Sequence, residues 1–296
     1  MVNIDGTHQI FTYVNQFLTE GGKEPLFNIQ LVGLDSETRQ GRGPFTITPD
    51  AMYTDIKKTD IIIIPAIFGD PREVYENNKE IIPWLLAQHK NGAEVVTYCV
   101  GAFFLAQTGL LNGRQAATHW TAATDFRKMF PQIDLVDDKI MTAEDGIYTS
   151  GGAYSYLNLI LYLIEKHVGR DMAILISKTF MIDIDKHSQS PFIIFQGQKT
   201  HEDKSIRKAQ EYIEKNYAEK ITVDEIAARF ALGRRSLERR FKKATSNAVS
   251  EYIQRVKVEA AKKSLELGSL AVNEVMYDVG YSDTKAFRNT FKKITG

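Results

Sequence analysis

The chain has 296 residues, 43% of them hydrophobic and 25% charged, a composition that excludes a fibrous or wholly disordered protein and predicts two domains. Lys+Arg and Asp+Glu are equal at 37 each, but residues 1–199 carry a net charge of −6 and residues 200–296 a net charge of +6. The basic C-terminal part is therefore where a polyanion is expected to bind.

Further features of the composition predict where the protein works. The single cysteine excludes an internal disulfide framework and suits a reducing cytoplasm. No apolar run approaches the length of a membrane span, and no signal peptide is visible. The six histidines are scattered without metal-ligand spacing. We therefore expect a cytoplasmic protein with no metal, no cofactor and no membrane contact.

The first two hundred residues alternate strand and helix. Strands are predicted at Phe27–Leu34, Ile61–Ile64, Glu94–Tyr98, Ala116–Thr118, Leu135–Met141 and Gly146–Thr149. Helices are predicted at Ile10–Leu18, Asn77–His89, Phe103–Thr108, Ala122–Met129, Tyr154–His167 and Arg170–Met181. This order predicts an α/β domain with a mainly parallel sheet and helices on both faces. The run of four isoleucines is predicted to be a strand buried on both faces.

Cys99 lies between a predicted strand and a predicted helix, just before Gly101. This is the geometry of a nucleophile elbow, and a helix N-terminus there would favour the thiolate. His119 follows a later strand and is placed to end on the same edge of the sheet. The alternative, which holds more often for one isolated cysteine and one isolated histidine, is a small buried hydrophobe and a hydrogen-bonded core histidine.

The residues around this cysteine resemble a known superfamily. CVGAFFLAQTGLLNGRQAATHW, followed by MFPQIDLVDDKIMTAEDGIYTSGGAYSYLNLILYLIE, is similar to the PfpI-like class I glutamine amidotransferases. It most resembles the form found ahead of AraC-type DNA-binding domains in GlxA-like regulators. The resemblance covers roughly residues 10–181 and implies a flavodoxin-like sandwich. It also implies a ligand pocket at the carboxyl edge of the sheet, near Cys99, His119, Ser150 and Gly151.

Two departures from the superfamily argue against catalysis. Enzymatic relatives place an acidic residue beside the cysteine, and the nearest candidate here is Asp5. They also carry a glycine-rich oxyanion turn, where this chain has Ala66 and Ile67, and a β-branched residue disfavours positive φ. Met1–Asp5 is too short for the superfamily's opening strand, so we expect a chain trimmed or wrongly started at both ends. The first domain is expected to be a sensor and not an enzyme.

A polar stretch with Pro191 follows, Asp183–Asp203, and it is predicted to be the linker between domains 1–182 and 204–296. Ile221–Thr245 then reads as a helix-turn-helix. Thr222 and Glu225 form a predicted capping box. A glycine in the turn, Gly233, can take a positive φ, and the second helix begins directly after it.

A second unit, Ala271–Gly296, repeats this pattern with a turn at Gly280 and a cap at Ser282. One amphipathic helix, about Val249–Leu267, joins the two units, which span about residues 222–245 and 271–296. The endings RRFKKATS and NTFKKITG match almost residue for residue. This arrangement resembles the all-α DNA-binding domain of AraC/XylS-type regulators. The resemblance implies that two recognition helices enter successive major grooves of double-stranded DNA.

The residues predicted to contact DNA occupy the outer faces of these two helices. They are Arg234, Arg235, Glu238, Arg239, Lys242, Lys243, Thr284, Lys285, Arg288, Asn289 and Lys292. Alignment with the family directs one set toward base edges: Arg235, Glu238, Arg239, Thr284, Lys285 and Asn289. Another set is expected to hold phosphates: Arg240, Lys242, Lys243, Lys292 and Lys293. The alternative for any one of them is a solvated surface side chain.

Three functions remain open from the sequence. The expected one is a transcriptional regulator with a small polar metabolite as effector. The resemblance also implies a homodimer formed through the first domain, and RNA polymerase is a candidate partner. The second is a Cys-dependent amidase or protease-like hydrolase tethered to DNA. The third is a redox sensor that acts through Cys99.

Overall fold

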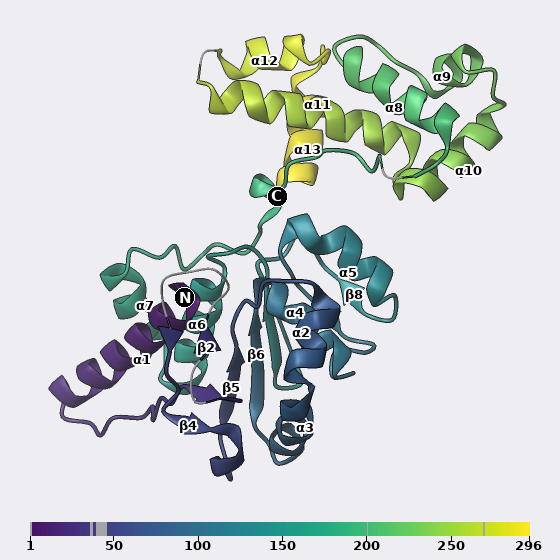
Figure 1. The fold of residues 1–296 in the computed structure, drawn as a ribbon. Coiled ribbons are helices and arrows are strands. Elements are labelled where there is room, and N and C mark those ends of the chain that lie inside the picture. The colour runs from purple at the N-terminus through teal and green to yellow at the C-terminus, as the bar shows by residue number, and fades with distance from the viewer. Residues whose placement is uncertain (1, 36–37, 40–45, 200, 269) are drawn as a thin grey trace. The chain divides into compact units, whose positions relative to one another are not determined.

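The computed structural model describes residues 2–35, 38–39, 46–199, 201–268 and 270–296. The chain forms two compact units, Met1–Gln189 and Ser190–Gly296 (Figure 1). The division between them falls inside the predicted linker, whose boundaries at 182/183 and 203/204 stay predictions. Among the described residues, no helix is both long enough and apolar enough to cross a membrane.

The N-terminal unit alternates short strands with helices. Its strands are β1 (Val32–Gly33), β2 (Thr38–Arg39), β3 (Thr46–Ile47), β4 (Ala51–Met52), β5 (Ile61–Ile64), β6 (Glu94–Tyr98), β7 (Gln115–Ala116), β8 (Asp134–Leu135), β9 (Met141–Glu144) and β10 (Ile147–Ser150). Its α-helices are α1 (Val2–Glu20), α2 (Pro71–Asn78), α3 (Ile82–Lys90), α4 (Ala102–Gln107), α5 (Ala123–Met129), α6 (Tyr156–His167) and α7 (Arg170–Thr179).

The central sheet has the strand order β5-β6-β10-β9, in which β5, β6 and β10 are parallel and β9 is antiparallel. Alternate residues of β6 face opposite layers. Val96 and Tyr98 join a core with α1, α6 and α7, whereas Val95 joins a second core with α4 and α5. Figure 1 shows these helix groups on the two sides of the sheet. The predicted α/β architecture is confirmed.

Several predicted elements differ in detail. Only Ile64 of the isoleucine strand is buried. The prediction of burial on both faces was wrong because β5 is an edge strand of the central sheet. The predicted strand at 135–141 is present only at its two ends, in β8 and β9. The predicted helix Asn77–His89 is two helices, α2 and α3. Pro83 stands in the first turn of α3, where its missing N–H costs no hydrogen bond.

The C-terminal unit is helical, as predicted. Its helices are α8 (Lys204–Lys215), α9 (Val223–Arg229), α10 (Arg234–Thr245), α11 (Val249–Glu266), α12 (Val272–Asp278) and α13 (Thr284–Thr295). One core joins α8, α9, α10 and the first half of α11, and a second core joins the rest of α11 to α12 and α13. The long helix α11 thus belongs to both helix-turn-helix units, which makes it the element that sets their separation.

Candidate functional site

The first helix-turn-helix begins with the predicted capping box. The amide of Thr222 donates to the Glu225 carboxylate at 2.7 Å, and the Glu225 amide donates to Thr222 Oγ1 at 3.2 Å. The prediction that Gly233 takes the positive φ of this turn was wrong. Gly233 has φ −68°, and the left-handed residue is Ala231, with φ 51°. An L-residue pays about 1–2 kcal/mol for this conformation, so the tight entry to α10 is strained.

The second helix of this unit turns one side to the core and the other to solvent. Leu237 and Phe241 are fully buried, as their i, i+4 spacing predicted. The predicted DNA-contacting residues of α10 are all exposed: Arg234, Arg235, Glu238, Arg239, Lys242 and Lys243. Packing of Leu237 and Phe241 into the core therefore determines which face of α10 is turned to solvent.

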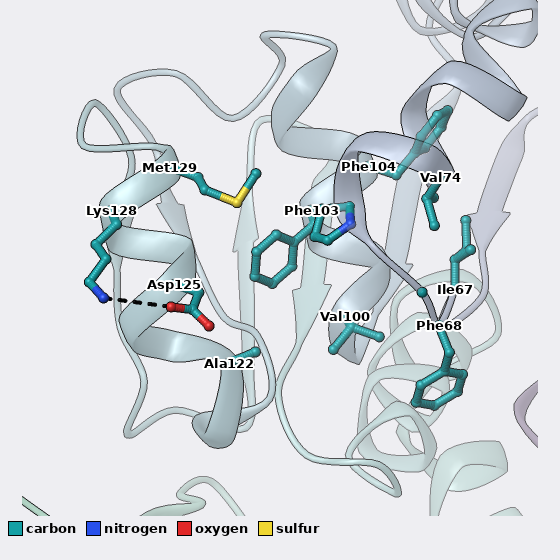
Figure 2. Close-up of a pocket in the computed structure, with 12 residues that line it drawn as sticks. Ile67, Phe68, Val74, Val100, Phe103, Phe104, Ala122, Asp125, Lys128 and Met129 are labelled. Carbon is teal, nitrogen blue, oxygen red and sulfur yellow. Dashed lines mark ion pairs between the residues drawn. The ribbon is translucent and has the colours of Figure 1, made fainter. Parts of the chain in front are cut away.

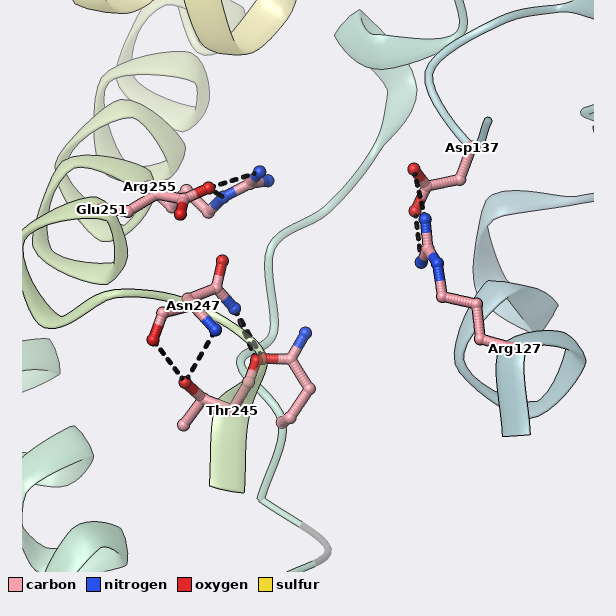
Figure 3. Close-up of polar contacts among 7 residues, drawn as sticks. Arg127, Asp137, Thr245, Asn247, Glu251 and Arg255 are labelled. Carbon is pink, nitrogen blue, oxygen red and sulfur yellow. Dashed lines mark hydrogen bonds and ion pairs between the residues drawn. The ribbon is translucent and has the colours of Figure 1, made fainter. Parts of the chain in front are cut away.

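The C-terminal end of α10 is tied to the start of α11 (Figure 3). The Asn247 amide donates to Thr245 Oγ1 at 3.2 Å, and its side-chain Nδ2 donates to the Thr245 carbonyl at 2.6 Å and to Gln198 Oε1 at 3.1 Å. One turn into α11, the Arg255 guanidinium pairs with Glu251 at 3.0 Å. These contacts leave the recognition helix little freedom relative to α11.

Two arginines of α10 already have partners. Arg234 pairs with Asp224 of α9 at 2.9 Å and with Glu238 at 3.3 Å. Arg240 donates from two nitrogens to the Asp203 carboxylate, at 2.8 and 2.6 Å, and this hydrogen-bonded pair holds the Asp203 pKa below its ordinary value. The expectation that Arg240 binds phosphate is therefore not favoured, because its guanidinium fastens α10 to the start of α8.

The second helix-turn-helix, formed by α12 and α13, repeats this design after the long helix α11. Gly280 takes the left-handed turn, with φ 75°. The cap of α13 is Asp283, whose carboxylate accepts from the Ala286 amide at 2.6 Å, so the prediction of a Ser282 cap was wrong by one residue. The predicted contact residues of α13 are all exposed: Thr284, Lys285, Arg288, Asn289 and Lys292.

The two recognition helices together present a set of unpaired cations. These side chains are exposed, and none has a carboxylate partner within the part of the chain that the structure describes: Arg235, Arg239, Lys242, Lys243, Lys285, Arg288, Lys292 and Lys293. Cations held on rigid helices without internal partners are suited to phosphate contacts, and arginines among them to base edges.

A buried lysine links the two helix-turn-helix units. Lys257 of α11 is only 8% exposed, and its ammonium donates to the carbonyls of Val279 at 2.8 Å and Glu219 at 3.3 Å. Burial lowers the Lys257 pKa from its ordinary value. Because Val279 ends α12 and Glu219 precedes α9, this side chain joins both helix-turn-helix units. Sequence reasoning missed it, although its spacing from Ile253 places it on the buried stripe.

In the N-terminal unit, Cys99 occupies the predicted elbow. It follows β6 directly, begins the 3-10 turn Cys99–Gly101 ahead of α4, and has φ 53°. The side chain is only 4% exposed, and burial raises the pKa of the thiol above its ordinary value. The expectation of a favoured thiolate is therefore wrong, because burial outweighs the backbone hydrogen bond from Val100, which lowers the pKa.

The predicted partners of a catalytic cysteine lie elsewhere. His119 Nδ1 accepts from the Thr121 amide at 3.2 Å, and burial lowers the His119 pKa, so its imidazole is neutral at pH 7. No hydrogen bond joins the Cys99 thiol to this ring within the described ranges. Asp5, the nearest acidic candidate for a partner of the cysteine, is exposed and accepts from Gln9 at 3.0 Å instead.

The loop after β5 also departs from an oxyanion hole. Among its described residues only Gly69 has a positive φ, of 138°, and neither Ala66 nor Ile67 does. This agrees with the expectation from β-branching.

The predicted ligand-binding segments nevertheless converge at the carboxyl edge of the sheet. Ser150 pairs in register with Tyr98, which precedes Cys99. Thr118 Oγ1, one residue before His119, donates to the Cys99 carbonyl at 2.9 Å. Sequence reasoning missed Gln189, whose side chain lies against Gly151 and donates to the Thr118 carbonyl at 3.2 Å. It belongs to the stretch predicted to be linker, where no local signal indicated a buried glutamine.

An apolar pocket of about 390 Å³ opens beside the elbow (Figure 2). It is lined by Ile67, Phe68, Gly69, Pro71, Val74, Val100, Phe103, Phe104, Ala122, Asp125, Lys128 and Met129. Asp125 and Lys128 form a 3.8 Å pair at one side, and Phe68 is 75% exposed. None of the four residues predicted to bind ligand lines this pocket, although Val100 follows Cys99 directly. This pocket is therefore separate from the predicted ligand site.

The fold and these surfaces define an α/β domain, with a nucleophile-elbow turn at Cys99, joined to a domain with two helix-turn-helix motifs. Comparison with protein families agrees. The DJ-1/PfpI family model matches residues 11–166, more than half of the chain, so the protein belongs to the DJ-1/PfpI family. A helix-turn-helix domain model matches residues 226–296. Both resemblances predicted from the sequence are confirmed.

Relatives that are named as HTH-type transcriptional regulators share this architecture. The chain is 26% identical over 279 residues to the HTH-type transcriptional regulator GbdR of Pseudomonas aeruginosa, covering 93% of this chain and 74% of the relative. It is 23% identical over 195 residues to the HTH-type transcriptional regulator GlxA of Rhizobium meliloti, covering 66% of this chain and 60% of the relative. A solved structure from Vibrio parahaemolyticus, described as a transcriptional regulator protein, matches with 26% identity and a TM-score of 0.54 over 62% of this chain and 92% of that one.

An enzyme also appears among the relatives. The chain is 25% identical over 131 residues to the isonitrile hydratase of Pseudomonas putida, covering 44% of this chain and 55% of the enzyme. The relatives that align over most of this chain are regulators, which favours a role other than catalysis.

Proposed function

We propose that this protein is a sequence-specific DNA-binding transcriptional regulator whose N-terminal domain senses a small metabolite. The observation that carries the proposal is the set of exposed, unpaired cations on two recognition helices held by one connecting helix. The AraC-type helix-turn-helix domain implies double-stranded DNA as the partner. The cations supply affinity through phosphates, and the side chains nearer the start of each helix supply specificity.

Base recognition is assigned to specific side chains. Arg235 and Arg239 are the candidates for bidentate contacts to guanine, and Asn289 for adenine. Arg234 and Glu238 bind each other, so we assign Arg234 to orienting the face of α10 and leave Glu238 free on its other edge for a cytosine amino group. If α11 and Lys257 hold the units rigid, the two helices meet major grooves about 34 Å apart on one face of the duplex.

The effector site is proposed at the carboxyl edge of the sheet, where Cys99, His119, Ser150 and Gly151 come together. Open α/β sheets bind ligands at this edge. The support from the structure is the convergence of these segments and the buried Ser150 hydroxyl, which has no hydrogen-bond partner among the described residues. A homodimer through the N-terminal domain, contact with RNA polymerase and a cytoplasmic location complete the proposal.

Catalysis is the second candidate, and the elbow conformation of Cys99 favours it. The raised pKa of the thiol, the neutral His119 bonded to Thr121, and the missing oxyanion glycines argue against it. We therefore propose that the domain is not an enzyme.

Genomic footprinting of the full-length protein, followed by binding to purified duplexes, tests the proposal. A shared asymmetric site with two boxes one helical turn apart is the expected result. Diffuse binding that disappears at moderate salt would mean that the basic faces are non-specific and would refute it. A Cys99→Ala protein that keeps full regulation in cells would argue strongly against the second candidate, because a Cys-dependent enzyme needs the thiol.

A further inference from the structure

The edge of the sheet proposed to bind the effector is already occupied by a side chain of the same unit. Gln189 is the last residue of the N-terminal unit and only 2% exposed. Its side-chain Nε2 donates to the carbonyls of Thr118 at 3.2 Å and Lys139 at 3.1 Å. Its backbone amide donates to the Asp138 carbonyl at 2.8 Å. A carboxamide from the connector thus lies at the convergence of the predicted ligand-binding segments.

The fit of this carboxamide depends on Gly151. A Cβ at that position would lie 2.5 Å from Gln189 Nε2 and 2.8 Å from Gln189 Oε1, so any larger residue would expel the side chain. Only half of the carboxamide is satisfied, however. Gln189 Oε1 and Ser150 Oγ are both buried, and neither has a hydrogen-bond partner in the described part of the chain. Buried polar atoms without partners cost free energy, and they mark places where a ligand gains from supplying them.

We infer, on the basis of the proposed function, that the effector is a small molecule with a primary carboxamide that displaces Gln189 and so frees the connector, residues 186–189. Two backbone carbonyls form the floor of the site, and they select a group with two N–H donors. A primary carboxamide reproduces both bonds. The Ser150 hydroxyl, buried and without a partner among the described residues, is a donor that a second polar group of the effector can use. A neutral amide also avoids placing an unpaired charge in a buried site.

Displacement has a direct route to the DNA-binding unit. The connector is held to the sheet edge by the Gln189 contacts, by a bridge between Lys139 and Ser188, and by the Ile140 amide, which donates to the His187 carbonyl at 3.3 Å. Ser190 begins the C-terminal unit. When the Gln189 carboxamide leaves its site, residues 186–189 are released from the sheet and add to the length of the chain that joins the two units. The length of such a tether changes the effective concentration of the domain that it carries.

Chemical rescue tests this inference in the full-length protein. Gln189→Ala removes a group equivalent to acetamide, and acetamide is the probe, with N,N-dimethylacetamide as the matched molecule that lacks N–H donors. Hydrogen exchange is followed at the backbone amides of Ile140 and of position 189, in the wild type and in the variant. Exchange is expected to be at least tenfold faster in the variant, and acetamide, but not its dimethyl analogue, is expected to restore protection.

Two further variants make the outcome decisive. Gln132→Ala removes an exposed glutamine of the same unit and is expected to leave exchange of the connector unchanged. Gln189→Glu keeps the size of the side chain but cannot donate two hydrogen bonds, since a carboxylate has no donor and a protonated carboxyl has one. Exchange should be fast, and acetamide should have no effect because the space is filled. Exchange within twofold of wild type in both Gln189 variants, or equal rescue by the two probes, overturns the inference.

Footprinting of the same proteins keeps the two proposals apart. If the wild type protects a specific DNA site but the Gln189 variants show no change of exchange, the displacement mechanism fails and the regulator stands. If acetamide restores protection but no specific DNA site is footprinted, the regulator proposal fails, and the assignment of the Gln189 position as a carboxamide-binding site is kept.

Discussion

The charge on the recognition helices makes a quantitative prediction about salt. Each phosphate that a cation neutralises on duplex DNA changes the slope of log Kobs against log salt concentration by about −0.9. Eight exposed cations on α10 and α13 lack partners in the described residues. If Arg235, Arg239 and Lys285 contact bases, five remain for phosphates. The expected slope for the whole protein is therefore roughly −5 to −7.

Lys242→Gln is the perturbation that tests this reasoning. Lys242 is exposed near the end of α10, where its ammonium can reach the backbone. Its loss should make the slope less negative by about 0.9 on specific and scrambled duplexes alike. Arg240→Gln is the matched control, since it removes the same charge from the same helix but from a group paired with Asp203, and its slope should stay at the wild-type value.

Fluorescence anisotropy across a salt series, with a duplex from the footprint and a scrambled duplex, measures both slopes. Circular dichroism of each variant confirms that the helices remain folded. An unchanged slope for Lys242→Gln would refute the assignment of this face to phosphate. An equal change for Arg240→Gln would show that the internal ion pair does not withhold that guanidinium from DNA.

Four other changes have expected outcomes. Ala231→Gly should stabilise the protein by about 1 kcal/mol in urea unfolding, because it relieves a left-handed alanine. Lys257→Met should weaken protection of one recognition box relative to the other in footprints, because it removes the donor shared by both units. Asp203→Asn keeps the helix cap but loses the pair with Arg240. The lowered folded pKa of Asp203 means that its stabilisation is present above its ordinary value of 3.8 and is lost as the pH falls through the folded pKa. The variant's stability should therefore fall less steeply in acid. Cys99→Ala should retain specific DNA binding in footprints, because both recognition helices belong to the C-terminal unit, and loss of the specific site would contradict this separation of roles.

What could be predicted from the sequence was encoded locally. A capping box needs only Thr222 and Glu225, and an elbow needs only a strand, Cys99 and a helix that follow one another. The errors at local signals were small, because Ala231 and Asp283 stand within two residues of the turn glycine and the cap that were predicted. Backbone geometry, not residue type, decides which position of a turn is left-handed.

What could not be predicted depends on partners far along the chain. Lys257 looks like an ordinary charged residue until Glu219 and Val279 are brought to its ammonium. The pair of Asp203 and Arg240 joins residues 37 positions apart. No periodicity within one helix indicates such contacts, so the reassignment of an arginine from phosphate to structure required the fold.

The predicted strand Phe27–Leu34 has the same explanation. Only Val32 and Gly33 are in a strand, and the start of the segment is bonded to helix α1 instead of to a neighbouring strand. Phe27 donates and accepts backbone hydrogen bonds with the Asn15 side chain of α1, and its ring lies 4.6 Å from that of Phe11. Alternating apolar residues indicate a half-buried extended chain, but they do not reveal whether a neighbouring strand exists to pair with it.

The elbow itself is better explained as scaffold than as a remnant of catalysis. A Cβ at Gly101 would lie 2.5 Å from the Pro65 carbonyl oxygen and 2.7 Å from Thr97 Oγ1, so the turn that begins at Cys99 packs against the end of β5 too closely for any residue but glycine at position 101. That turn presents the Cys99 carbonyl to Thr118 Oγ1, and the Thr118 carbonyl in turn accepts from Gln189. A strained cysteine with a protonated, buried thiol thus still performs a function: it positions the acceptors of the site proposed to release the connector.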